Sequence, residues 1–68
     1  MASSNRLREL RRARGLSQED LARLLGVSGY TVTRWEAGHM VPNARHARQL
    51  ARRLGVSVDD LRLGDQPT

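Results

Sequence analysis

The segment from residue 18 to residue 37, QEDLARLLGVSGYTVTRWEA, constrains the fold of this chain more than any other part of it. It contains two short helical patterns that meet at a turn centred on Gly26. Their apolar side chains recur at the spacing of a helix face and belong to Leu21, Ala22, Leu25, Val27, Val32 and Trp35. The opposite side of the second pattern consists of Gly29, Tyr30, Thr33 and Arg34. We therefore expect two helices that share one core and leave the second helix with an exposed polar face.

The rest of the chain also favours helices, and we predict an all-α fold, a compact bundle of five helices without strands. The helices are expected at about 4–14, 18–25, 28–36, 44–54 and from Ser57 to Leu61 or Leu63. Side chains able to cap a helix N-terminus precede them: Ser3 or Ser4, Ser17, Ser28, Asn43 and Ser57. Asp20, three residues after Ser17, fits a capping box. Glycines suited to the end of a helix follow the first four: Gly15, Gly26, Gly38 and Gly55.

The length of 68 residues allows one small domain, which we expect to span the chain, with an ordered core at about residues 4–63. The first helix contributes Leu7 and Leu10 to the predicted core. The fourth helix contributes an inward stripe of Ala44, Ala47, Leu50, Ala51 and Leu54. Trp35 is expected to lie in the core as well.

All 12 basic residues other than histidine are arginines, and they face seven acidic residues, which gives a net charge of +5. Such an excess favours a polyanionic partner, above all nucleic acid. The chain lacks an apolar run long enough to span a membrane and lacks a signal peptide, so we expect no membrane association and a cytoplasmic location.

Nothing in the sequence indicates an enzyme, a cofactor or a small-molecule ligand. The absence of cysteine excludes disulfides and thiolate metal sites. His39 and His46 lack accompanying ligands at metal-binding spacing, and no nucleophile has an evident base, so we predict no metal site and no catalysis.

The segments SQEDLARLLGVS, TVTRWEAG, a proline loop and QLARRLGVSVDDL together resemble the helix-turn-helix domain of the lambda repressor and Cro type, also called the xenobiotic-response-element family. The resemblance covers Leu7 to Leu63. It implies a DNA-binding domain with its helix-turn-helix at residues 18–37. It also implies that the third helix, at about 28–36, enters the major groove of double-stranded DNA.

Four residues on the exposed face of that helix are the expected base contacts: Gly29, Tyr30, Thr33 and Arg34. Arg34 suits a bidentate contact to O6 and N7 of guanine, although a phosphate contact or a solvated side chain is the alternative. Tyr30 suits a thymine methyl or a phosphate, and Thr33 can offer its methyl group to thymine. Gly29 has no side chain to read a base and instead permits close approach of the backbone.

The family resemblance places further residues at the DNA backbone, which fixes register without carrying sequence information. In the family, the glutamine at Gln18 lies against a phosphate and supports the recognition helix. The expected phosphate contacts are Ser17, Gln18, Ser28, His39, Asn43 and Arg45. The family also often has an ion pair at the positions of Arg11 and Glu36, which ties the first helix to the third.

Apolar residues near the C-terminus, Val58, Leu61 and Leu63, exceed what a short last helix needs. Some can belong to the core, and the others predict a patch for a weak homodimer stabilised on DNA. The first function hypothesis is therefore a transcriptional regulator that acts as a repressor and binds an inverted repeat as a two-fold dimer. The alternatives are a protein-interaction module, such as an antitoxin or a coactivator-type bridging factor, and the DNA-binding domain of a longer ligand-responsive regulator.

Overall fold

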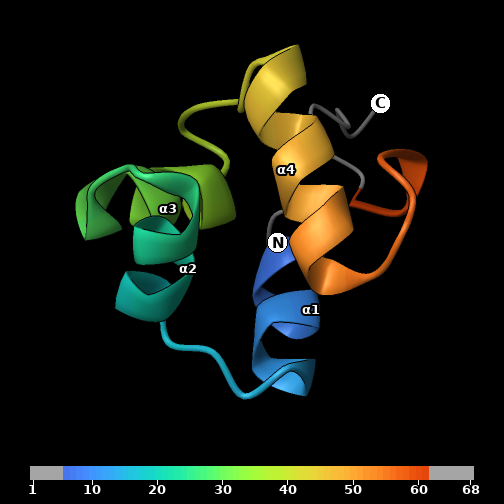
Figure 1. Ribbon diagram of the computed structural model, residues 1–68. Helices are drawn as coiled ribbons and strands as arrows, with labels where there is room; N and C mark the ends of the chain where they lie inside the picture. Colours follow the sequence, from blue (N-terminus) through green and yellow to red (C-terminus); the bar gives the residue numbers. More distant parts are fainter. Residues whose placement is uncertain (1–5, 62–68) are drawn as a thin grey trace.

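A computed structural model describes residues 6–61 of the chain. Four α-helices and a terminal 3₁₀ turn follow one another in these residues: α1 (Leu7–Ala13), α2 (Gln18–Leu25), α3 (Gly29–Ala37), α4 (Ala44–Leu54) and η1 (Asp59–Leu61). Between residues 6 and 61 there is no strand, so the predicted all-helical fold is confirmed for this part. In Figure 1, α2 and α3 lie together on one side of the molecule, and α4 and α1 lie on the other.

The predicted count of five helices is not confirmed, because within residues 6–61 the segment after α4 forms a 3₁₀ turn of three residues and no further α-helix. Ser57 and Asp60 bond reciprocally, backbone to side chain, at 3.2 and 3.3 Å. Leu61 N–H then donates to the carbonyl of Val58, three residues back, at 3.1 Å. This bonding closes a tight turn that ends at Leu61, within the described residues. The expected extension to Leu63 lies outside them.

Local side-chain chemistry sets most helix ends as the sequence predicts. Ser17 and Asp20 form the expected capping box of α2, and Ser28 and Asn43 accept backbone bonds at the starts of α3 and α4. The exception is α1, whose cap residue is Arg6 and makes no side-chain capping bond. The expected caps Ser3 and Ser4 lie outside the described residues. Arg6 N–H instead donates to the carbonyl of Leu61 at 3.0 Å, which joins the start of α1 to η1.

The turn between α2 and α3 depends on Gly26, whose φ of +73° is left-handed. A side chain in this conformation costs about 1–2 kcal/mol, whereas glycine adopts it freely. The N–H of Val27 donates back to the carbonyl of Ala22 across this turn at 3.0 Å. The turn therefore fixes the angle at which α3 leaves α2.

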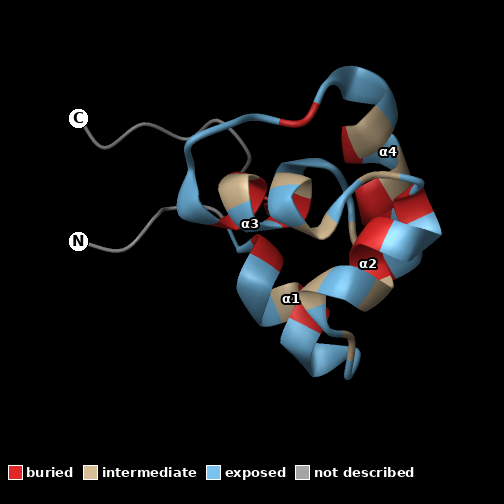
Figure 2. Cartoon of the chain, turned by 90° about the vertical axis from the view of Figure 1, so that its left-hand side faces the viewer, coloured by how far each residue is buried: buried red, intermediate tan, exposed pale blue. Residues whose placement is uncertain are grey.

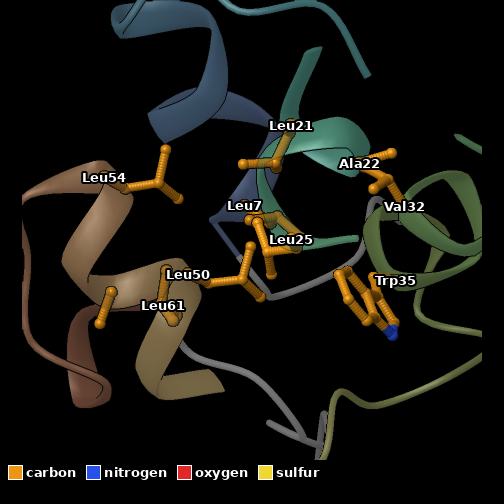
Figure 3. Packing of buried hydrophobic residues seen from close by; sticks show 10 residues of the cluster. Leu7, Leu21, Ala22, Leu25, Val32, Trp35, Leu50, Leu54 and Leu61 are labelled. Atoms are coloured by element: carbon orange, nitrogen blue, oxygen red, sulfur yellow. The ribbon is translucent and has the colours of Figure 1, made fainter. Parts of the chain in front are cut away.

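The core lies between the two helix pairs, as the close view of its side chains shows (Figure 3). Its members are buried apolar residues from every element: Leu7, Leu21, Ala22, Leu25, Val32, Trp35, Leu50, Ala51, Leu54 and Leu61. Val27 packs against them while only partly buried. Ala44 was predicted to face inward but is exposed, because it begins α4 one turn before the first buried position, Ala47. Each helix thus has one buried side and one exposed side (Figure 2).

Candidate nucleic-acid interface

The side of α3 that points away from the core carries the residues predicted to contact bases. Tyr30 is 68% exposed, and Thr33 is exposed as well, whereas Gly29 and Arg34 are half-buried. Val32 and Trp35, on the other side of the helix, are buried in the core. The inward side therefore holds α3 in place while its outward side remains available to a partner.

Arg34 and Tyr30, one helical turn apart, form a pair on this face. Arg34 Nη1 donates to the Tyr30 hydroxyl at 3.0 Å, and the guanidinium carbon lies 5.5 Å from the centre of the tyrosine ring. The two contacts combine a hydrogen bond with a cation–π interaction. They hold the arginine side chain near one conformation and leave further guanidinium N–H groups to donate. Sequence reasoning treated the two residues separately, although their spacing of four could have indicated the contact.

Gln18 connects this face to the interior of the domain. Its Nε2 donates to Glu36 Oε1 at 2.9 Å, and its Oε1 accepts a bond from the Thr33 hydroxyl at 2.9 Å. The same hydroxyl lies 3.1 Å from the carbonyl of Gly29. The first residue of α2 therefore supports α3 directly, as the family resemblance implied.

Glu36 lies at the centre of a charged cluster that joins three helices. The expected ion pair is present: Arg11 Nε and Nη2 donate to the two carboxylate oxygens at 2.5 and 3.2 Å. Arg11 Nη1 also donates to the carbonyl of Leu16 at 2.7 Å. Arg8 adds a second ion pair to Glu36 at 3.6 Å. The sequence alone assigned no role to Arg8, although its spacing of three from Arg11 places both on one side of α1.

The environment of Glu36 sets the sign of its pKa shift. Burial of its side chain, which is 1% exposed, raises the pKa of the carboxyl. The hydrogen bonds from Arg11 and Gln18 and the charges of Arg11 and Arg8 lower it, and together they leave the pKa below its ordinary value. Glu36 is thus a carboxylate at neutral pH and can only accept hydrogen bonds.

Some of the residues predicted to contact the DNA backbone cap helices, and others are exposed side chains. The side-chain oxygens of Ser17, Ser28 and Asn43 accept capping bonds from backbone N–H groups. His39 and Arg45 are exposed on the loop after α3 and on the first turn of α4. Helix N-termini and exposed arginine side chains such as Arg45 suit phosphate groups.

The predicted dimer patch does not stay together in the structure. Leu61 is fully buried, because η1 folds its side chain into the core, so it is not a surface residue as the patch required. Val58 is 41% exposed. Leu63 lies outside the described residues. Of the patch, Val58 is therefore the member that the described part of the chain presents at the surface.

Two further observations concern other classes of function. The ring of His46 packs on that of Trp35, with centroids 5.5 Å apart and planes tilted by 51°. Among residues 6–61, no three histidine, cysteine, aspartate or glutamate side chains gather as metal ligands would. No helix in that range has the length and apolar character needed to cross a membrane.

The comparisons with known proteins agree with this geometry. A family model described as "Helix-turn-helix" matches residues 7–61. The chain is 32% identical over 66 residues to the HTH-type transcriptional activator BcrR of Enterococcus faecalis, and the match covers 97% of this chain but only 32% of that protein. Two uncharacterised HTH-type transcriptional regulators, from Methanocaldococcus jannaschii and Archaeoglobus fulgidus, are 39% and 37% identical. These matches cover 84% and 88% of this chain and 86% of each archaeal protein.

Proposed function

The chain belongs to the lambda repressor-like helix-turn-helix family of DNA-binding transcriptional regulators, and we propose that it is a repressor that recognises a specific double-stranded DNA sequence. Repression requires only that the bound domain occupy its operator. The activator from Enterococcus faecalis is about three times as long as the matched region, so its regulatory sign is not transferred to this chain.

One observation carries the proposal: the exposed Tyr30 and the half-buried Arg34 form a pair on α3 opposite its buried side. A major groove accepts an α-helix, and its base edges present donors and acceptors that differ between base pairs. We assign the base contacts to Gly29, Tyr30, Thr33 and Arg34. The proposed phosphate contacts are Ser17, Gln18, Ser28, His39, Asn43 and Arg45.

We further propose that two copies bind an inverted repeat. A single module buries only about 600–1,000 Å² on DNA, and two-fold pairs double the number of base contacts. The two recognition helices of such a pair lie about 34–36 Å apart, one turn of the duplex. Of the predicted dimer patch, Val58 is exposed in the described part of the chain, so the proposed dimer depends mainly on the two half-sites of the DNA.

The test is selection of binding sites from a random pool of duplex DNA at physiological salt, followed by sequencing. We expect an inverted repeat. Arg34→Ala should then lose discrimination at one base pair in each half-site, by about 1–3 kcal/mol. Arg23→Ala is the matched control, because it removes the same charge from a side chain that is 77% exposed on α2 and lies 3.8 Å from Asp20.

The selection can also contradict the proposal. Recovery of no motif, with only weak binding that salt abolishes, would show general electrostatic attraction instead of sequence recognition. A motif without two-fold symmetry, together with one chain per duplex in sedimentation, would contradict the proposal that two copies bind the DNA. In vitro transcription from a promoter that contains the selected site then decides the sign of regulation.

A further inference from the structure

Thr33 has a side chain whose hydroxyl is already engaged within the protein. Its Oγ1 lies 2.9 Å from Gln18 Oε1 and 3.1 Å from the carbonyl oxygen of Gly29, and both of these atoms are acceptors. A threonine hydroxyl has one proton to donate, and these two oxygens share it. The hydroxyl proton of Thr33 is therefore already hydrogen-bonded within the protein and is not available to DNA.

The direction of the bond to Gln18 follows from the cluster behind it. Glu36 is a carboxylate that only accepts, so Gln18 must turn its Nε2 group toward it, at 2.9 Å. The amide oxygen of Gln18 then faces Thr33, whose hydroxyl has to act as the donor. Arg11 holds Glu36 from the other side. This chain of contacts runs from α1 to the exposed face of α3.

These contacts determine which hydrogen bonds Thr33 can still make with DNA. Its hydroxyl cannot donate to the major-groove acceptors, which are O6 and N7 of guanine, N7 of adenine and O4 of thymine. The hydroxyl oxygen can still accept a bond, but thymine presents no donor in the major groove, so toward thymine the exposed Thr33 offers its methyl group. A methyl group in the major groove finds an apolar partner in the C5 methyl of thymine.

We propose that Thr33 recognises a C5 methyl group on a pyrimidine, so that the methyl group of thymine or of 5-methylcytosine strengthens binding at one position of each half-site. Cytosine and uracil, which lack this methyl group, bind more weakly there. Binding of the protein thereby responds to cytosine methylation of its site. This inference rests on the proposed function, since it names the chemical group that one residue of the α3 face recognises.

The experiment uses the duplex obtained by site selection and measures affinity by fluorescence anisotropy at constant salt. Each thymine of one half-site is replaced in turn by uracil, and at the position that responds the T·A pair is also replaced by a C·G pair that carries either cytosine or 5-methylcytosine. At one position, loss of the methyl group should weaken binding about fourfold, as expected for exposing one buried methyl group. At that position 5-methylcytosine should bind about fourfold more tightly than cytosine, as thymine binds more tightly than uracil. The last comparison isolates the methyl group, because both forms of cytosine carry the same N4 amino group.

Two variants connect the effect to Thr33, whose side chain is exposed, and each is judged by its own ratio of affinities for thymine and uracil. Thr33→Ser keeps the hydroxyl and its bonds but removes the methyl group, and it should bind thymine and uracil equally. Thr33→Val keeps a methyl group and should retain the fourfold preference. If the preference persists in Thr33→Ser, or if no position distinguishes thymine from uracil, the inference is wrong. Failure of the proposed function differs from both results, because the selection would then yield no motif on which to make the substitutions.

Discussion

Replacement of Arg11 by methionine should destabilise the domain through the charge that it leaves behind. The side chain of Arg11 is 9% exposed and that of Glu36 is 1% exposed. Methionine keeps much of the apolar stem of Arg11 but removes both bonds to Glu36 and the bond to the carbonyl of Leu16. Glu36 then remains buried with weaker compensation for its negative charge.

The expected cost follows from what Glu36 retains. Removing one partner of a buried ion pair costs about 3–5 kcal/mol. Gln18 still donates to the carboxylate, and Arg8 lies 3.6 Å from it, so the lower end, about 3 kcal/mol, applies. A domain of this length has a total free energy of unfolding of about 3–10 kcal/mol. The variant should therefore lose about a third or more of the total free energy of unfolding.

Urea unfolding followed by far-ultraviolet circular dichroism measures this loss. Arg6→Met is the matched control, because Arg6 pairs with Glu9 at 3.4 Å with both side chains well exposed, and such a pair contributes less than about 1 kcal/mol. The double variant with Arg11→Met and Glu36→Gln should recover part of the lost stability, since no buried charge is left. Equal losses in Arg11→Met and Arg6→Met, or no recovery in the double variant, would refute this reasoning.

Three further predictions concern stability. The pKa of Glu36 is lowered in the folded state, so its contribution to stability is present above the ordinary pKa of 4.5 and is lost as the pH falls through the pKa of the folded state. The urea midpoint should therefore drop on acidification, and it should drop less steeply in Glu36→Gln. Gly26→Ala should cost about 1–2 kcal/mol because φ is +73°, whereas Gly29→Ala, helical and with 3.4 Å to the nearest side-chain atom, should be neutral or stabilising in the same urea assay. Leu61→Ala should lower the free energy of unfolding by the cost of a core cavity, about 2–5 kcal/mol, and a loss no larger than that of Val58→Ala in the same urea assay would contradict the burial of Leu61.

The sequence alone determined the features that depend on neighbours along the chain. The capping residues Ser17, Ser28 and Asn43 and the left-handed Gly26 could be predicted, because a cap or a turn involves residues only a few positions apart. The same local spacing separated the buried side of α3 from its exposed side. The length of the last helical segment could not be predicted in this way. Ser57 and Asp60 are typical of a helix start, but residues 59–61 form only a 3₁₀ turn.

Only the tertiary structure decided how residues far apart in the chain share partners. The sequence does not show whether an apolar residue near the C-terminus lies in the core or at the surface. Leu61 is buried because η1 lies beside the start of α1. Likewise, Arg8 and Gln18 meet Glu36 only because α1, α2 and α3 converge at its carboxylate. The direction of the hydrogen bond from Thr33 depends on that meeting. The periodicity of each helix is a local property, whereas the group that each exposed residue offers to a partner is set by contacts between helices.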